Sequence, residues 1–258
     1  MQHKNDQLFL SASDLANHLG CRHLTQLDLL AAYRQLRPPV WIDPKLETLQ
    51  RRGLEHEEKY VRHLEDTFGM QSHRVEEGLE GLAAVERTVE LMRRGQDVIV
   101  QASLTQATWR GRADILLKTD APSDLGGWSY EIIDTKLARQ TKAETILQLC
   151  LYAELVEAIQ GRLPERIGVV TPLSQQPEWY RTRDFMAYFR YVKRSLLAAI
   201  DAREETSADP VVRCEVCRWW SHCRQHWREI DHLSLVAGIS RGQRRELEVR
   251  GVVTLAAF

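Results

Sequence analysis

The stretches 111–117, Gly-Arg-Ala-Asp-Ile-Leu-Leu, and 131–136, Glu-Ile-Ile-Asp-Thr-Lys, decide the fold of this chain. Each combines a short apolar run with an acidic residue, which is typical of strands buried in a sheet. Asp134 and Lys136 are two residues apart, so both side chains leave the same face of the strand, about 7 Å apart along it. Asp114 lies on the preceding predicted strand, where pairing would bring it alongside.

Elements of both kinds are predicted on either side of these strands. Apolar residues at helical spacing predict helices over residues 11–35, 44–68, 79–94, 141–160 and 184–203. Alternating or β-branched runs between turn residues predict strands over 97–102, 107–118, 128–136, 166–171 and 178–183. This order predicts an α/β protein with a mixed central sheet flanked by helices.

Composition places few limits on function. A chain of 258 residues can bury a sizeable core, and its net charge of −1 does not by itself indicate a polyanionic partner. Binding of DNA would therefore depend on local basic clusters. The sequence contains no apolar run of membrane-spanning length and no signal peptide, which predicts a cytoplasmic protein without membrane partners, whose cysteines stay reduced.

The acidic residues of the two central strands predict a metal site. Carboxylates that converge on one point repel each other unless a cation lies between them, and Mg²⁺ or Mn²⁺ is the usual partner of such oxygens. Lys136 beside that ion could orient the attacking water and offset charge in the transition state. An Asp-x-Lys triplet on a strand is, however, often only a solvated face.

Two helices carry further candidates. Gln148 and Tyr152 are four residues apart and share a helix face. His56 lies on the earlier helix, although a single helical histidine is more often a surface or core residue than a ligand.

Four cysteines bracket the candidate site: Cys21 far upstream, and the cluster Cys214-x2-Cys217-x5-Cys223. Four thiolates suit Zn²⁺ or an iron–sulfur cluster. Zinc ribbons usually consist of two close pairs, which this spacing does not match. Cys150, among leucines, is predicted to be a small buried hydrophobe.

Arginines and three tryptophans surround the cysteine cluster. Trp219, Trp220 and Trp227 could stack on bases of single-stranded DNA, or they could shield a metal centre from water. We favour shielding for at least two of the three.

The motifs Gly53-x2-His56, Gly111-x2-Asp114, Asp134-x-Lys136 and Gln148-x3-Tyr152 together resemble the ordered motifs of RecB-type nucleases of the PD-(D/E)xK superfamily. The resemblance covers about residues 8 to 228 and implies a restriction-endonuclease-like fold. It implies that His56, Asp114, Asp134 and the Thr135 carbonyl bind Mg²⁺ or Mn²⁺, and that Lys136 is the catalytic lysine. Gln148 and Tyr152 would position DNA or the charges of the site. The third-motif acid is Asp134, where many relatives carry Glu.

The cysteines narrow the resemblance to the iron–sulfur branch, which includes the nuclease domain of AddB and the CRISPR-associated RecB-like exonucleases. The likeness is greatest to stand-alone RecB-like nucleases of bacteria. It implies that a 4Fe-4S cluster held by Cys21, Cys214, Cys217 and Cys223 joins the N-terminal helical region to the C-terminal cysteine loop.

The activity implied is hydrolysis of DNA single strands or ends, as an exonuclease, in repair, recombination or CRISPR-type processing. Two alternatives remain open from the sequence. One is a DNA-end-binding scaffold that keeps the fold without turnover, and the other is a nuclease whose cysteines hold zinc.

The sequence predicts a nuclease domain over residues 1–230 and a separate tail over 231–258. The tail resembles a helix-hairpin-helix unit, with Ser240 where that motif has its second glycine. Its apolar end, Leu-Ala-Ala-Phe, suggests a fragment of a longer protein or a tail that docks on a partner. The resemblance implies a further nuclease or helicase domain or subunit beyond residue 258.

Overall fold

The computed structural model describes residues 1–40, 46–75, 78–79, 81–203 and 205–258. It forms two compact units, each built from two segments of chain. Unit 1 comprises Met1–Ala16 and Asp43–Ser195, and unit 2 comprises Asn17–Ile42 and Leu196–Phe258.

Helices and strands alternate through the first unit, and the second is built mainly from helices. The strands are β1 (Gln2–Lys4), β2 (Gln7–Phe9), β3 (Ser72–Arg74), β4 (Val98–Gln106), β5 (Trp109–Thr119), β6 (Ser129–Thr135), β7 (Arg166–Val170) and β8 (Glu178–Arg181). The α-helices are α1 (Ala12–Gly20), α2 (Arg22–Ala32), α3 (Leu46–Phe68), α4 (Gly81–Arg93), α5 (Ala143–Gln160), α6 (Thr182–Ala202), α7 (Trp220–Glu229) and α8 (Arg241–Val249), and two 3₁₀ turns are η1 (Val212–Val216) and η2 (Leu233–Leu235).

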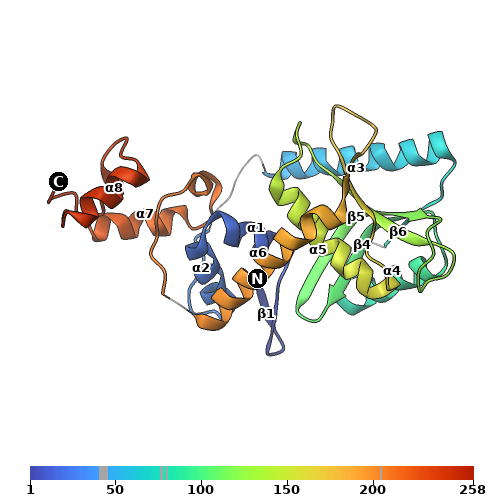
Figure 1. Ribbon diagram of the computed structural model, residues 1–258, viewed down its shortest axis with the longest axis horizontal. Coiled ribbons are helices and arrows are strands. Elements are labelled where there is room, and N and C mark those ends of the chain that lie inside the picture. Colours follow the sequence, from blue (N-terminus) through green and yellow to red (C-terminus); the bar gives the residue numbers. More distant parts are fainter. Residues whose placement is uncertain (41–45, 76–77, 80, 204) are drawn as a thin grey trace. The chain divides into compact units, whose positions relative to one another are not determined.

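A six-stranded mixed sheet, in the order β3-β4-β5-β6-β7-β8, is the centre of unit 1 (Figure 1). The pairs β3–β4 and β6–β7 are parallel, and the other three pairs are antiparallel. Each parallel connection contains a helix, α4 in the first and α5 in the second, because parallel neighbours need a crossover. This confirms the predicted mixed α/β sheet flanked by helices, consistent with a restriction-endonuclease-like fold.

The apolar runs of the central strands form the core of unit 1. Helix α3 packs Tyr60, Val61 and Leu64 against one face of the sheet, where they contact Val98, Val100, Ile115, Ile133 and Val170. Helix α5 contacts β4, β5, β6 and β7 and is buried on most of its sides. Cys150 on α5 is fully buried, as predicted. The two helices therefore hold the strands that carry the acidic residues on a rigid support.

Several predicted boundaries differ from the structure. The single helix predicted over 11–35 is two helices that break at Cys21, the N-cap of α2 with φ −163°. The polar N-terminus forms the β1–β2 hairpin, and β3 was not predicted. Strand β4 continues to Gln106, where the prediction ended at residue 102. The predicted helix start at residue 44 lies outside the described residues.

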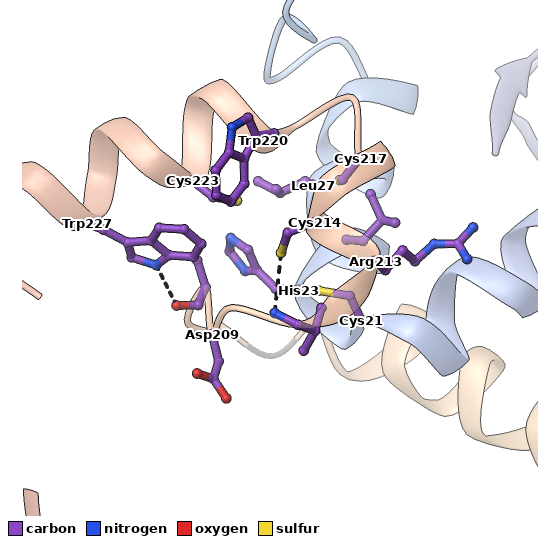
Figure 2. A pocket seen from close by; sticks show the side chains of 13 residues that line it. Cys21, His23, Leu27, Asp209, Arg213, Cys214, Cys217, Trp220, Cys223 and Trp227 are labelled. Carbon is purple, nitrogen blue, oxygen red and sulfur yellow. Dashed lines mark hydrogen bonds between the residues drawn. The ribbon is translucent and has the colours of Figure 1, made fainter. Parts of the chain in front are cut away.

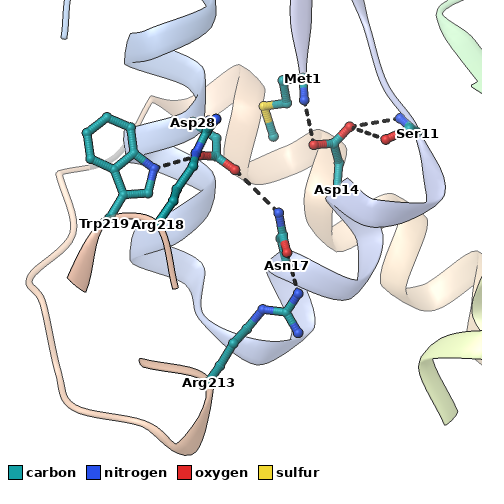
Figure 3. Close-up of polar contacts among 8 residues, drawn as sticks. All are labelled: Met1, Ser11, Asp14, Asn17, Asp28, Arg213, Arg218 and Trp219. Atoms are coloured by element: carbon teal, nitrogen blue, oxygen red, sulfur yellow. Dashed lines mark hydrogen bonds and ion pairs between the residues drawn. The ribbon is translucent and has the colours of Figure 1, made fainter. Parts of the chain in front are cut away.

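A buried carboxylate organises unit 2 (Figure 3). Asp28 on α2 is 5% exposed and accepts hydrogen bonds from the Arg218 guanidinium at 2.7 Å and the Trp219 indole at 2.7 Å. Asn17 donates to its other oxygen at 3.4 Å. Since Asp28 and Trp219 are far apart in sequence, this one side chain links the two segments of the unit.

The predicted cysteine loop is partly helical. Cys214 lies in η1, whereas Cys223 lies on α7. Ser240 caps α8 with a reciprocal pair of hydrogen bonds to Gln243, which gives it a helix-capping role. After α8 the chain returns, and Thr254 pairs with His232. Within the described residues, no helix is long and apolar enough to cross a membrane.

Candidate active site

The pairing of β5 with β6 brings the two aspartates together. Ile115 pairs with Ile133, and one further step in this register places Asp114 opposite Asp134. The two side chains then share one face of the sheet. The Thr135 amide and hydroxyl donate to Asp114 Oδ2 at 2.8 and 3.0 Å, which fixes the carboxylate against the end of β6.

Asp134 is buried, and a lysine and an amide contact its carboxylate. Lys136 Nζ lies 2.6 Å from Asp134 Oδ2, and Gln148 Nε2 donates to Oδ1 at 3.0 Å. Lys136 is 32% exposed, so its ammonium can contact both the carboxylate and solvent. Burial, together with the Asp114 charge, raises the pKa of Asp134 to about 7. The site therefore holds more negative charge than its own residues neutralise.

Gln148 and Tyr152 lie where the sequence places them, on one face of α5 toward Asp134. Gln148 Nε2 also donates to the Tyr152 hydroxyl at 3.2 Å. Burial raises the pKa of Tyr152, and the Asp134 charge adds to this effect. Tyr152 is thus a neutral hydrogen-bonding group that holds Gln148 in position.

The glycine of the Gly-x2-Asp motif makes room for that tyrosine. A Cβ at Gly111 would lie 2.5 Å from Tyr152 Cε1 and 2.7 Å from Cδ1. No substituent fits there unless the ring moves. The motif therefore joins a packing requirement at Gly111 to the chemistry of Asp114.

His56 lies at the same end of the sheet but contacts a different group. Its Nε2 is 3.2 Å from the Val170 carbonyl oxygen, which also accepts from the Lys136 amide. Val170 pairs with Thr135 in the β6–β7 register. The structure thus brings His56 close to the end of β6, while its role as a metal ligand, like that of the Thr135 carbonyl, stays a prediction.

Two polar residues of the site were missed by the sequence reasoning. Glu57, next to His56, is 4% exposed and accepts hydrogen bonds from Gln101 and from Arg74, the latter at 3.3 Å. Burial and the charge of Asp114 raise the pKa of Glu57, so a third carboxyl group belongs to this region.

Gln101 has φ +58° and stands opposite Asp114 in the β4–β5 register, at a step where the pairing is interrupted. A left-handed residue of this kind inside a strand is a strained conformation, which often accompanies a functional site. Helical spacing gave no sign of Glu57, because an acidic residue beside a histidine on a polar helix is common.

Comparison with known protein families fits this geometry. Residues 15–224 match the family model described as "PD-(D/E)XK nuclease superfamily". The chain belongs to this superfamily. Members of the nuclease superfamily are typically metal-dependent nucleases that use divalent ions such as Mg²⁺ or Mn²⁺.

A solved structure described as "Crystal structure of SSO0001" is similar, with 14% sequence identity and a TM-score of 0.44. The match covers 86% of this chain and 89% of that chain. No curated protein matches the sequence.

The acidic residues suit the divalent ion of the nuclease superfamily in their chemistry. Asp114 raises the pKa of both Asp134 and Glu57, so the three carboxyl groups lie within electrostatic reach of one another. A hard cation would relieve that repulsion. As the side chains stand, no three His, Cys, Asp or Glu residues of the described chain form a complete metal-binding group. An ion at this site would therefore take part of its coordination from water, substrate or a backbone carbonyl.

The four cysteines of the chain ends line one pocket of unit 2 (Figure 2). All of them are free thiols, and Leu24, Leu27 and Trp219 pack around three of them. Burial and the neighbouring thiols raise the pKa values of Cys21 and Cys217, and that of Cys223 to about 12. As the side chains stand, no three of these thiols among the described residues form a metal-binding group.

Two of the three tryptophans beside the cysteines are buried. Trp219 and Trp227 are buried, and their indole nitrogens donate to Asp28 and to the Ala208 carbonyl. Trp220 is 40% exposed and lines the cysteine pocket with Trp227. Base stacking on Trp219 or Trp227 is incompatible with this burial, so two of the three tryptophans form the wall of the cysteine region.

A substitution at Gly111 tests the link between packing and chemistry. Gly111→Ala should displace the Tyr152 ring and lower the free energy of unfolding by roughly 1–3 kcal/mol, the usual effect of overpacking. Urea unfolding measures the change. Gly53→Ala is the matched control: nothing lies within 4 Å of its Cβ, and alanine should stabilise helix α3 by up to about 1 kcal/mol. Equal stability of the two variants would contradict the tight contact.

The raised pKa of Asp134 predicts a pH dependence of stability without divalent ions. Because the folded pKa is about 7 and the ordinary value is 3.8, the stabilising contribution is complete below about pH 4. It is lost as pH rises through 7, with a total loss of about 4 kcal/mol. Thermal unfolding in EDTA between pH 4 and 8 measures this loss, and Asp134→Asn should flatten the profile. A wild-type profile as flat as that of the variant would count against the raised pKa.

Proposed function

We propose that this chain is a Mg²⁺- or Mn²⁺-dependent DNA nuclease that hydrolyses phosphodiester bonds of single strands or DNA ends. One observation carries the proposal. Asp114, Asp134 and Lys136 meet where the pairing of β5 with β6 ends, with the buried Asp134 carboxylate 2.6 Å from the lysine, in a chain of the nuclease superfamily. A buried charge cluster of this kind is costly for folding, which favours a catalytic role over a solvated face.

The residues of the site have two proposed roles, to hold the divalent ion and to act on the attacking water and the phosphate. The divalent ion would supply charge for the scissile phosphate and a more acidic water, and Asp114 and Asp134 would hold it, with His56 and the Thr135 carbonyl as further ligands. Lys136 is placed to orient the attacking water and to offset charge on the phosphate oxygens. Gln148, held by Tyr152, keeps the Asp134 carboxylate facing the lysine.

The competing function is a DNA-end-binding scaffold without turnover. The ion pair of Asp134 with Lys136 and the double contact of Thr135 on Asp114 favour catalysis, because a binding module needs neither. Both functions predict DNA binding, so cleavage decides between them.

Labelled oligonucleotides provide the test. Single- and double-stranded DNA carrying a 5′ or a 3′ label are incubated with Mn²⁺, with Mg²⁺ and with EDTA. The proposal expects ion-dependent cleavage that EDTA abolishes, and the length of the labelled products distinguishes exonuclease from endonuclease action. Binding without cleavage in every ion would leave the scaffold function.

We further propose that Cys21, Cys214, Cys217 and Cys223 hold a 4Fe-4S cluster with a structural role. The arrangement of all four thiols around one pocket supports a shared ligand, since a cation would offset their mutual repulsion as thiolates. The alternative is a single zinc ion, which four thiolates also suit.

Metal analysis of protein purified without oxygen separates these two. A cluster predicts brown protein, broad absorbance near 400 nm and about four iron atoms per chain. One zinc atom per chain and no visible absorbance would instead establish the zinc site. Cys217→Ser should lower the metal content in either case, whereas Cys150→Ser should leave it unchanged because Cys150 lies in unit 1.

A further inference from the structure

Two tyrosines on helix α6 form an exposed aromatic pair in unit 1. Tyr188 is 51% and Tyr191 58% exposed, and their rings stack with centroids 6.3 Å apart and an interplanar angle of 27°. Large aromatic side chains usually bury most of their area, so a stacked pair in solvent is unusual. Neither ring takes part in the site at Asp114 and Asp134.

Three arginines run along the helix beside this pair. Arg183, Arg190 and Arg194 are exposed, and their spacing of seven and four residues puts them on one stripe of α6, with Tyr191 and then Tyr188 farther round the same exposed side of the helix. No ion pair to any of the three is found among the described residues. Asp184 is the acidic residue nearest this stripe in the sequence.

Lys193, on the inward side of α6, is paired with a carboxylate, unlike these three arginines. Lys193 forms an ion pair with Glu154 and lies over the rings of Trp109 and Phe189. The protein therefore neutralises the cation that packs on its core and leaves the outward arginines available. Unpaired guanidinium groups attract phosphate oxygens, which they bind in a bidentate manner.

The stripe continues into a groove at the start of α6. Arg162, Arg181 and Arg183 line this groove, together with Glu157 and Glu165. Arg183 thus belongs to both the groove and the helix face. A rise of 1.5 Å per residue separates Arg190 from Arg194 by about 6 Å along the helix, close to the distance between neighbouring phosphates of an extended strand.

We infer that this face of α6, named here the tyrosine–arginine face (Arg183, Tyr188, Arg190, Tyr191, Arg194), binds a single-stranded nucleic acid outside the catalytic site. The tyrosine pair offers a ring surface on which an unpaired base can stack, and the arginines hold the phosphates on either side of it. A duplex keeps its bases stacked internally and gains only the phosphate contacts. The inference deepens the proposed nuclease function, on which it rests, by naming a surface that holds the substrate strand.

Binding in EDTA tests this surface without cleavage. Fluorescence anisotropy of a labelled oligothymidylate is measured with full-length wild type and with the pair Tyr188→Ala and Tyr191→Ala. We expect the aromatic loss to weaken binding at least about tenfold, since base stacking on an aromatic ring is a large part of single-strand affinity. The pair Tyr188→Phe and Tyr191→Phe keeps the rings and should bind within about twofold of wild type.

The arginines have a separate readout. Arg190→Ala with Arg194→Ala should reduce the slope of log affinity against log salt by about 1.4, or about 0.7 for each phosphate that an arginine no longer neutralises. Arg93→Ala, an exposed arginine at the end of α4, is the matched control and should leave the affinity unchanged. Circular dichroism checks that each variant is folded.

The outcomes separate this inference from the proposed activity. If binding depends on the tyrosines and on salt as expected but wild type cleaves no DNA in Mn²⁺, the binding role of the tyrosine–arginine face is supported and the nuclease proposal is wrong. If wild type cleaves DNA and the variant with both Tyr188→Ala and Tyr191→Ala binds as tightly as wild type, the binding role of the tyrosine–arginine face is wrong and the nuclease proposal stands. Self-association that the tyrosine substitutions abolish would also overturn it, because the face would then be an interface between copies.

Discussion

Lys136→Met should lower the rate of DNA cleavage by roughly 10³-fold while the protein stays folded. Methionine keeps much of the length of the side chain but removes the ammonium that lies 2.6 Å from Asp134. The charge that orients the attacking water and stabilises the phosphate oxygens is then missing. Initial rates on labelled single-stranded DNA in Mn²⁺ measure the effect.

A second lysine provides the control for this prediction. Lys142 is the exposed N-cap of α5 and carries the same ammonium group as Lys136. No ion pair of Lys142 with Asp114 or Asp134 is found among the described residues. Lys142→Met should keep cleavage within about twofold of wild type, as expected for an exposed side chain outside the transition state. Full activity of Lys136→Met would remove the lysine from the mechanism, and an equal loss in both variants would indicate a general effect of charge on DNA binding.

Asp28→Ala should destabilise unit 2 by roughly 3 kcal/mol. The substitution leaves the buried Trp219 indole and the Arg218 guanidinium without their acceptor, and unmade buried hydrogen bonds and half-broken ion pairs are among the most costly single changes. Thermal unfolding followed by tryptophan fluorescence reports the loss, because Trp219 donates directly to Asp28.

Glu246→Ala, in the same unit, is the matched control for Asp28. Its carboxylate pairs with Arg250 on the surface of α8, where both side chains are largely exposed. Such pairs contribute at most about 0.5 kcal/mol, so its unfolding temperature should hardly change. If Asp28→Ala unfolds at the temperature of Glu246→Ala, Asp28 does not link the two segments.

The sequence predicts the central sheet because its strands carry short apolar runs between turn residues. In β6 the residues from Ser129 to Asp134 are all buried, so a continuous apolar run, and not an alternating pattern, defines this strand. The Asp-x-Lys spacing then places Asp134 and Lys136 on one face without knowledge of the partners. Helical spacing likewise places Gln148 and Tyr152 on one face of α5, whereas the contact of Gln148 with Asp134 depends on how α5 packs on the sheet.

Other features depend on contacts that no local pattern contains. Glu57 belongs to the site because α3 packs on the sheet near Gln101, whose side chain donates a hydrogen bond to Glu57. Gln101 has a left-handed backbone conformation, which the local sequence does not predict. The break at Cys21 divides a run with continuous helical periodicity, so spacing alone merged α1 with α2. The burial of Trp219 depends on Asp28, far away in the sequence, which is why local sequence does not distinguish stacking on DNA from shielding.

The division of unit 2 into two distant segments has a consequence for the order of folding. Residues 17–42 form one compact unit with residues 196–258, and the six strands of the mixed sheet all lie between these segments. During synthesis from the N-terminus, the complete sheet leaves the ribosome first. Asp28, in the first segment of unit 2, therefore lacks its partners Arg218 and Trp219 until the last quarter of the chain has been synthesised.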